Sequence, residues 1–277
     1  MGRSLNYSQA RNTKAPVLKY IFVKVLPKLF YFFLFLGLWH AVVVIFNIKV
    51  FILPSPIRVF QIIFNPQMAA KYQWLKHIGA TFTEVGLSFL ATVFVALSLA
   101  LVITWSKIMS QLLMPIITMF NSLPKVALAP VFLLWFGYGL LPNIMIAILV
   151  AFFPLVINTV TGLKAVDDDL LDLVRYLNAS KLQVFLKIRI PNSLPYIFAG
   201  LKISATLCVV GSIVGEFIAS EKGLGFLIRD SQAFIDMPAM FACLIMLSTM
   251  GYLLFSFILL LEKLFMPWNV TYKRKKV

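Results

Sequence analysis

The sequence is poor in charged residues, cysteine and histidine. Charged side chains occupy 13% of the 277 positions, against roughly 25% in soluble domains. The two cysteines, Cys208 and Cys243, stand inside apolar segments without the spacing of a metal site or a disulfide framework. The two histidines, His40 and His77, have no second histidine or carboxylate at ligand spacing. We therefore expect free thiols, no metal and no cofactor.

Signs of an enzyme are missing as well. The thirteen glycines include no G-x-x-x-x-G-K-[S/T] phosphate-binding loop, so the chain is not expected to hydrolyse ATP by itself. The apolar segments show no nucleophile beside a base and no paired catalytic carboxylates. The acidic run at 167–169 looks like a helix start instead. We predict that the protein is not an enzyme.

Apolar residues are abundant: they occupy 61% of the positions and form runs about twenty residues long. As a helix, such a run spans ~30 Å of hydrocarbon. A very large soluble core would also be apolar, but runs of this length fit a bilayer better. We predict an all-α integral membrane protein with about six transmembrane helices, placed at Phe30–Ile48, Thr81–Trp105, Leu112–Phe136, Leu141–Leu163, Leu194–Ala219 and Met240–Leu264.

The net charge of +15 comes from basic residues that lie mostly between these runs, not along one face as in a nucleic-acid-binding protein. Segments on one side of the predicted membrane hold sixteen Lys and Arg residues, against six on the other. Because cytoplasmic segments are the basic ones, both tails are expected in the cytoplasm. The chain then divides into a basic tail with the anchor start at 1–29, a transmembrane domain at 30–265 and a basic tail at 266–277.

Two predicted spans depart from a uniform lipid-facing helix. Prolines at 115, 124 and 130 interrupt the third, and Lys125 lies between two of them. Proline removes a backbone N–H, so neighbouring helices or water must satisfy the freed carbonyl groups. In the fifth, Gly211 and Gly215 have the G-x-x-x-G spacing that allows close helix approach. We expect a break in the third span and tight packing of the fifth inside the subunit.

Charged residues at membrane depth need a partner or a wet cavity, because their insertion costs about 3 kcal/mol. Lys125 could contact an anionic solute or make a structural pair. Glu216 could gate the outer end of its span or cap a re-entrant loop at 223–225. Glu84 and Lys202 lie near span ends and are expected to reach the interface. Lys125 and Glu216 are therefore the candidates for a solute pathway.

The only sizeable polar interruption lies between the fourth and fifth spans. Asp167 and the two aspartates after it supply N-cap oxygens and negative charge for a helix start. Asn178 stands where a residue in the left-handed conformation ends a helix. Ser180, with Gln183 three residues later, is a capping-box pattern. We predict two short helices joined by a turn, the second of them ending at Pro191.

Both short helices carry an apolar stripe. It includes Leu173 and Leu177 in the first helix, and Phe185 and Ile188 in the second. Amphipathic helices outside the membrane dock into a groove on a partner or lie on the lipid surface. The segment 167–191 is therefore predicted to be an interaction site of one of these two kinds.

This segment resembles the cytoplasmic motif of the permeases of binding-protein-dependent ABC importers. The motif reads E-A-A, three residues, G, nine residues and I-x-L-P. In the same register, this sequence has Asp172-Leu173-Val174, Asn178 and Ile188-Arg189-Ile190-Pro191. Every spacing is kept, whereas the glutamate is Asp, both alanines are larger, the glycine is Asn and the leucine is Ile. The change to Asn is mild, because Asn tolerates the left-handed backbone that glycine adopts.

Other stretches resemble the nitrate, sulfonate and taurine branch of these permeases, and the likeness runs from about residue 30 to residue 265. They are Pro54-Ser55-Pro56 with Val59, the run from Leu123 to Pro130 followed by Leu134-Trp135-Phe136-Gly137, and Gly215-Glu216-Phe217 with Gly223-Leu224-Gly225.

The resemblance implies a type I importer permease in a bacterial inner (plasma) membrane, importing a small solute such as nitrate, a sulfonate, taurine or a vitamin precursor. It implies a transmembrane dimer, expected to be a homodimer, with cytoplasmic ATP-binding subunits and an external solute-binding protein. An ion-coupled carrier or channel is the alternative, although carriers more often show repeated halves. In the importer, a coupling-helix pair would contact the ATP-binding subunit through Asp172, Leu173, Val174, Leu177, Asn178, Ala179, Ser180, Phe185, Ile188 and Pro191.

Overall fold

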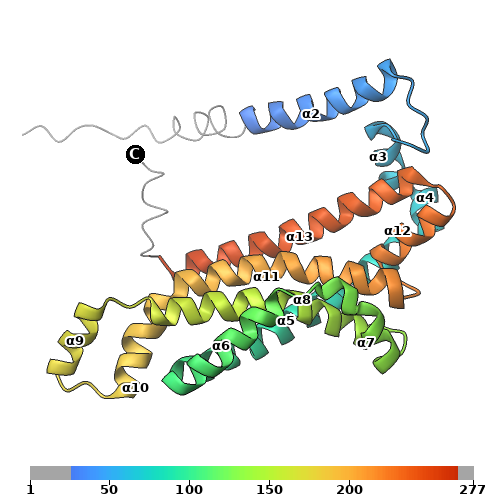
Figure 1. Ribbon diagram of the computed structural model, residues 1–277. Helices are drawn as coiled ribbons and strands as arrows, with labels where there is room; N and C mark the ends of the chain where they lie inside the picture. Colours follow the sequence, from blue (N-terminus) through green and yellow to red (C-terminus); the bar gives the residue numbers. More distant parts are fainter. Residues whose placement is uncertain (1–25, 268–277) are drawn as a thin grey trace, which may run out of the picture.

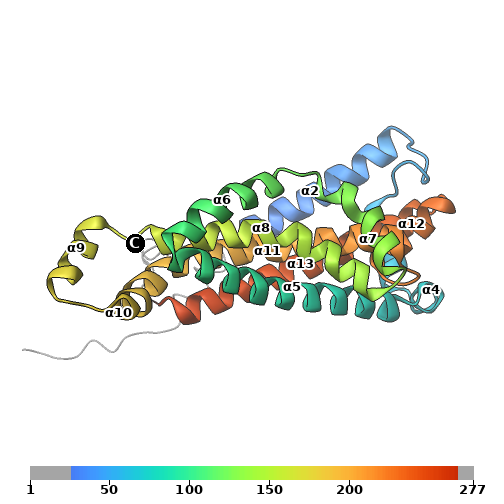
Figure 2. The ribbon, with the colours of Figure 1, turned by 60° about the horizontal axis from the view of Figure 1, so that its bottom comes forward.

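The computed structural model describes residues 26–267, which contain helices and short turns and no strand. Apart from α2, which diverges from the others, the helices form one elongated bundle (Figure 1). In two views, α9 and α10 project from one end, whereas α4, α7 and α12 lie at the other (Figures 1 and 2). The bounds are α2 Leu26–Ile45, α3 Pro56–Phe64, α4 Pro66–Tyr72, α5 Trp74–Trp105, α6 Lys107–Asn121, α7 Ala129–Phe136, α8 Leu140–Lys164, α9 Asp168–Tyr176, α10 Lys181–Val184, α11 Ile190–Ala219, α12 Leu224–Ala233 and α13 Met237–Phe265.

The centre of the bundle is the contact between α8 and α11, the most extensive between any two helices. The two backbones approach closely because glycines of α11 face the backbone of α8. A Cβ atom at Gly211 would lie 2.5 Å from the Cα of Ala147, and one at Gly215 would lie 2.8 Å from the Cα of Asn143. The G-x-x-x-G spacing therefore serves packing inside the chain, which confirms the prediction. α5 packs against both α8 and α11 and completes a three-helix core.

Four helical segments are long and apolar enough to cross a membrane by themselves: α5, α8, α13 and a continuous helix at Lys181–Ala219. The helices at Lys107–Asn121 and Lys125–Phe136 pass the same test only together. They are bent by 85° and so form a broken span or a re-entrant loop. The apolar part of α2, Leu29–Ile45, is shorter. All six predicted segments are thus helical, and length and composition support four spans, or five if the bent pair is one.

The predicted break in the third span is present. α6 ends at Asn121, a turn leads to Pro124, and a 3-10 turn at Lys125–Leu128 precedes α7. The Lys125 Nζ donates to the main-chain oxygen of Asn121 at 3.0 Å and to its Oδ1 at 2.9 Å. A side chain therefore satisfies a carbonyl group at the end of α6, as a break at membrane depth requires.

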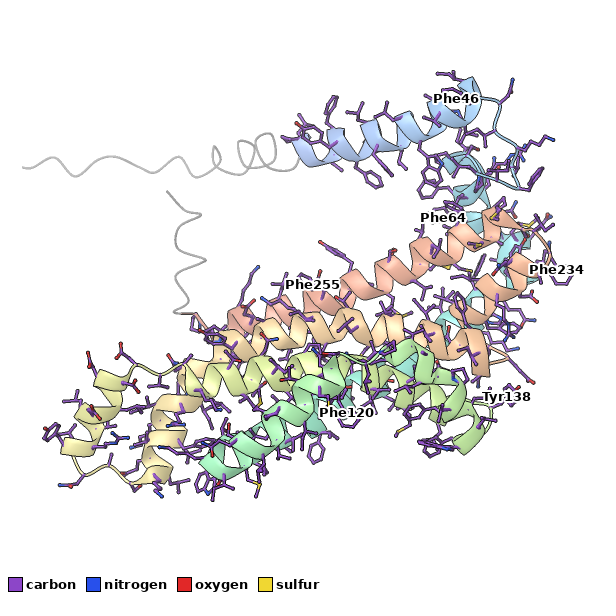
Figure 3. The ribbon with its side chains drawn as sticks, viewed as in Figure 1. Phe46, Phe64, Phe120, Tyr138, Phe234 and Phe255 are labelled. Carbon is purple, nitrogen blue, oxygen red and sulfur yellow. The ribbon has the colours of Figure 1, made fainter. Side chains whose placement is uncertain are left out.

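Large apolar side chains cover the outside of the long helices. Phe94 on α5 is 74% exposed and Tyr252 on α13 is 70% exposed. Figure 3 shows Phe46 and Phe120 among the side chains that point away from the bundle. An apolar surface of this extent is a liability in water and is favourable in hydrocarbon. The fold therefore has its apolar surface where a bilayer would surround it.

Gly211→Ala is expected to destabilise the fold. The added methyl group would lie 2.5 Å from the Cα of Ala147, so α8 and α11 would have to separate, at a cost on the order of 1–3 kcal/mol. The purified chain should then unfold roughly 2–10 °C lower in a thermal scan. Gly86→Ala on α5 is the matched control, because a Cβ there meets nothing within 4 Å. Equal unfolding temperatures for the two variants would contradict this account of the α8–α11 contact.

Candidate functional site

Residues 167–191 form a helical hairpin, named the hairpin below, between the end of α8 and the body of α11. It contains α9, α10 and a π-helical turn at Phe185–Arg189. The hairpin projects beyond the end of the bundle (Figures 1 and 2). Its apolar side chains are consequently open to a partner: Leu177 is 71% exposed and Leu173 is 56% exposed.

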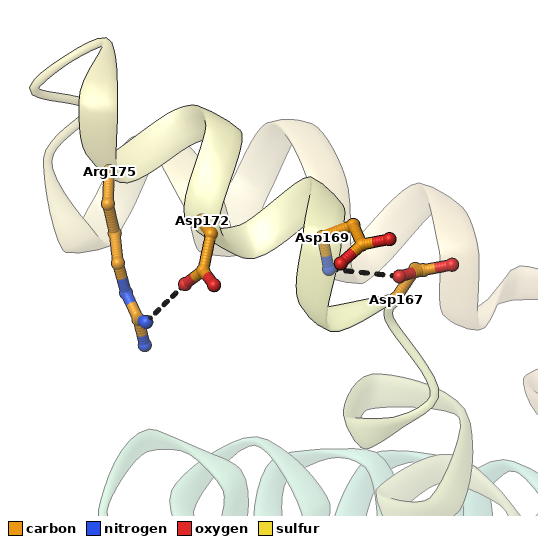
Figure 4. A network of polar contacts seen from close by, with 4 residues as sticks. All are labelled: Asp167, Asp169, Asp172 and Arg175. Carbon is orange, nitrogen blue, oxygen red and sulfur yellow. Dashed lines mark hydrogen bonds and ion pairs between the residues drawn. The ribbon is translucent and has the colours of Figure 1, made fainter.

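The start of α9 is capped as the sequence predicts. The Asp167 Oδ1 accepts a hydrogen bond from the main-chain N–H of Asp169 at 2.9 Å (Figure 4). One turn later, Asp172, the acidic residue of the motif, forms a 2.7 Å ion pair with Arg175 (Figure 4). Both side chains are largely exposed, so the pair adds little to stability. Its charges remain available at the hairpin surface.

The turn of the hairpin is also built as predicted. Asn178 has a φ of 53°, in the left-handed region. The N–H of Asn178 donates to the oxygen of Arg175 at 2.9 Å, and the N–H of Ala179 to that of Val174 at 3.0 Å. These two bonds make a Schellman motif, in which a left-handed residue lets the last carbonyl groups of a helix find donors. Local chemistry alone therefore fixes the turn.

The second helix begins with a complete capping box. The Ser180 side chain accepts from the N–H of Gln183 at 3.2 Å, and the Gln183 side chain accepts from the N–H of Ser180 at 2.9 Å. The predicted end at Pro191 is wrong, however, because the helix continues through the π turn into α11. The N–H of Ile190 bonds to the oxygen of Phe185, five residues back. Pro191, which has no N–H to donate, directly follows the π turn within this continuous helix.

At the opposite end of the bundle, Glu216 caps the start of α12. Its Oε2 accepts from the N–H of Gly225 and its Oε1 from the Thr81 hydroxyl, each at 2.5 Å. The N–H of Leu224 donates to the Thr81 oxygen at 2.8 Å, and that of Gly223 to the His77 Nδ1 at 3.0 Å. Three successive N–H groups at a helix start thus find acceptors on α5 and α11, as a buried helix end requires.

Glycine is required in this loop. Gly223 has a φ of +115°, which side-chain-bearing residues rarely adopt. A Cβ atom at Gly225 would lie 2.8 Å from the Glu216 Oε2. The Gly223-Leu224-Gly225 sequence is therefore needed for the carboxylate to reach the backbone. Of the two roles considered for Glu216, the structure shows the loop cap.

The sequence comparisons agree with this architecture. Residues 92–266, more than half of the chain, match the family of binding-protein-dependent transport system inner membrane components. The chain belongs to this family. Its members are the permease subunits of ABC importers, so the protein has a transport role in the inner membrane, and the family works with ATPase and binding-protein partners.

Individual relatives cover most of the permease. It is 32% identical to the formylaminopyrimidine transport permease protein ThiX of Halalkalibacterium halodurans, over 79% of this chain and 86% of that protein. It is 26% identical to the taurine transport system permease protein TauC of Escherichia coli, over 84% and 86% of the two chains. A chain of the inward-facing MetNI methionine ABC transporter matches at a TM-score of 0.60 and 18% identity, over 70% of the permease and 97% of that chain. The last match shows the type I importer fold.

The residues predicted for docking all lie on the hairpin or at its junction with α11, but they differ in exposure. Phe185 is half-buried, because its ring packs edge-on against Trp105 with centroids 5.4 Å apart. The exposed residues are Asp172, Leu173, Leu177, Asn178, Ser180 and Pro191, and the half-buried ones are Val174, Ala179, Phe185 and Ile188.

Glu84 and Lys202 have partners inside the bundle and do not extend outward, as anchoring at the interface would require. α5 begins at Trp74 and not near Thr81, so Glu84 lies about three turns inside the helix. It is 1% exposed and accepts from the Asn143 Nδ2 at 3.1 Å. Lys202 pairs with Glu262 on α13, with the Nζ 3.1 Å from Oε2.

Sequence reasoning also missed the partners of these charges. On α5, four buried polar residues recur every three or four positions: Thr81, Glu84, Ser88 and Thr92. A polar stripe of this kind on an apolar helix indicates a buried polar site, and it can be read from the sequence. Asn143 and Glu262 carry no comparable signal, because each meets its partner from a distant part of the chain. No hydrogen bond or ion pair joins the two pathway candidates, Lys125 and Glu216, within the range 26–267.

Asn178→Val is expected to weaken the hairpin locally. A β-branched residue at a φ of 53° costs roughly 1–2 kcal/mol in the left-handed region. Amides of residues 168–189 should then exchange with deuterium roughly 5–30 times faster. Asn178→Gly is the matched variant and should exchange as the natural chain does, because glycine adopts this φ without strain. Unchanged exchange in the Val variant would show that the turn is not what holds the hairpin.

Proposed function

We propose that the permease binds an ATP-binding subunit through the hairpin and imports a small solute as part of a dimer of two copies of this chain. The observation that carries the proposal is the set of exposed leucines on a hairpin whose two caps fix its shape. Apolar side chains held rigidly in the open favour docking, because little conformational entropy is lost on binding. ATP hydrolysis belongs to the separate subunit, since this sequence has no phosphate-binding loop.

The charges of α9 favour a protein partner over the lipid surface. Its first turn and cap hold three aspartates at 167–169, and Asp172 follows, whereas Arg175 is the single basic residue of the helix. Anionic cytoplasmic lipids attract basic segments and repel acidic ones. The hairpin also extends away from the bundle (Figure 2). Both features support docking of α9 into a groove of a soluble subunit, with Asp172 and Arg175 at its polar rim. The second half of the hairpin is basic, with Lys181, Lys187 and Arg189.

The hairpin and both termini belong on the cytoplasmic side in this proposal. Support comes from the sixteen basic residues on that side against six on the other. The basic tails themselves lie outside the described residues. The end with α4, α7 and α12 would then face the external binding protein.

The proposed solute is small, either an anion such as nitrate, a sulfonate or taurine, or a vitamin precursor. Relatives named for nitrate, taurine, aliphatic sulfonates and formylaminopyrimidine support this range. Selectivity would lie largely in the external binding protein. Lys125, at the break between α6 and α7, is the proposed contact for an anionic solute; it lies 5.2 Å from the centroid of the Phe153 ring. Glu216 would act on the pathway by holding α12.

Leu177→Asp is expected to release the ATP-binding subunit. Leu177 is 71% exposed, so the permease should still fold with a charge at this position. The binding free energy of a docked interface would fall by about 2 kcal/mol, which is roughly 30-fold in affinity. Co-purification of the permease with a co-expressed candidate ATPase subunit measures the effect. Phe234→Asp is the control, since this equally exposed apolar residue lies at the other end (Figure 3). Full retention of the ATPase by the Leu177 variant would rule out docking through this face.

Lys125→Gln is expected to slow uptake without disturbing assembly. Gln can still donate to Asn121, but the positive charge that would attract an anion is lost, at a cost of roughly 1.5 kcal/mol or about tenfold in uptake at low solute concentration. Lys125→Arg keeps the charge and should retain more activity. Uptake is measured with the solute that shifts the melting temperature of the binding protein. If the Gln variant transports normally, the role of Lys125 is structural, namely its hydrogen bonds to the end of α6.

A further inference from the structure

Two acidic side chains meet in the interior near the end opposite the hairpin. Glu84 of α5 and Glu216 of α11 are almost completely buried. They lie next to each other: Glu216 bonds to Thr81, one turn before Glu84 on α5, and Glu84 bonds to Asn143, which packs against Gly215 beside Glu216. Among residues 26–267, no ion pair reaches either of them. Two ionised carboxylates in contact repel each other strongly in a medium of low dielectric constant. Without a cation, the arrangement needs a proton.

The surrounding hydrogen bonds favour Glu84 as the carrier of that proton. Glu216 accepts at both oxygens, from the Thr81 hydroxyl and from the N–H of Gly225. Glu84 accepts at Oε1 from Asn143, whereas its Oε2 is buried and receives no donor. A buried oxygen without a hydrogen bond costs free energy. A hydrogen on the Glu84 Oε2 removes this cost, because it can be donated to Glu216.

We propose that Glu84 and Glu216 form a proton-binding site, in which one proton sits on the Glu84 Oε2 and the resulting acid–carboxylate pair fixes α12 to α5 and α11. The ligand of this site is a proton. One negative charge remains, on Glu216, and it lies at the start of α12, where a helix stabilises an anion. Removal of the proton puts a second negative charge beside the first and weakens the attachment of α12.

The site has a route to solvent. Glu84 lines a cavity of about 440 Å³ together with Lys76, Tyr138, Glu221 and Lys222. With the orientation of the proposed function, this cavity opens on the outer side; the proton-binding site itself does not depend on that orientation. Asn143, which is neutral, faces the pair from α8. The other ionisable groups near the pair or its loop are His77 on α5, Asp230 on α12, and Asp236 and Cys243 next to or on α13.

The site makes stability depend on pH in a defined direction. In the unfolded chain both glutamates are exposed and ionised at neutral pH. Folding therefore takes up a proton, and stability falls as the pH rises. In Glu84→Gln, the amide N–H replaces the acid O–H as the donor to Glu216, so no proton has to be taken up. This variant therefore keeps the hydrogen bond between the two side chains and removes the pH dependence that comes from proton uptake.

The test uses the full-length chain in lipid nanodiscs, with any subunit that co-purifies retained. Glu84→Gln should keep the melting temperature at neutral pH within about 2 °C and should reduce its fall at alkaline pH. Glu216→Gln should melt roughly 4–8 °C lower, because one carbonyl oxygen cannot accept both hydrogen bonds. Infrared spectra at neutral pH should show the carbonyl band of a buried carboxylic acid, and this band should disappear in Glu84→Gln.

Glu221→Gln is the matched control, because Glu221 is exposed and lines the same cavity. It should leave the infrared band and the pH dependence unchanged. The proposal is overturned if the natural chain lacks the band, if Glu84→Gln retains it, or if Glu84→Gln melts as low as Glu216→Gln. A tolerated Glu216→Gln beside a destabilised Glu84→Gln would also overturn it, by placing the proton on Glu216. None of these measurements needs an ATPase or a solute, so they are independent of the docking experiment.

Discussion

The close contact between α8 and α11 connects the two ends of the permease. The hairpin leaves the bundle from the end of α8 and returns to it as α11. At the opposite end, Asn143 on α8 and Glu216 on α11 hold the polar cluster that caps α12. Glycine brings the two backbones together along this contact. The hairpin and the cap of α12 are therefore attached to opposite ends of the same two helices.

Pairing of buried charges is the second constraint that shapes the bundle. In hydrocarbon, an ionised side chain needs a partner within the protein. Lys202 forms an ion pair with Glu262, and Lys125 donates a hydrogen bond to the end of α6. Glu216 accepts a hydrogen bond from the start of α12. Each of these bonds ties one helix to another element or closes a break in the chain. The few charged residues at depth thus act as cross-links between otherwise apolar helices.

The hairpin differs from the rest of the molecule because its shape comes from short-range chemistry. An aspartate cap, a left-handed asparagine and a capping box occur within seventeen residues, at 167–183. Such signals act between residues at most five positions apart. They leave Leu170 and Leu173 of α9 exposed. A surface of this kind has its use in an assembly, which agrees with a family that works with an ATPase partner.

The sequence by itself determined the membrane class, the helical segments, the break at the prolines and the caps of the hairpin. All of these depend on composition or on neighbours along the chain, and a single sequence displays both. Helix ends were less certain: α5 begins about seven residues before its predicted span, and this error moved Glu84 from the interior to the interface. The π turn was also missed, because it depends on a backbone register and not on a residue type.

Only the tertiary structure decided which charges meet. Glu84 lies 132 positions from Glu216, and Lys202 lies 60 from Glu262. Their local sequence does not select one partner over another. The pairing depends on which helix packs against α11 and on which residues lie level with each other along the two helices. Whether a carboxyl group keeps its charge, reaches the interface or holds a proton depends on those neighbours. The physical reason is that the free energy of a buried charge is set by atoms close in space, wherever they lie in the chain.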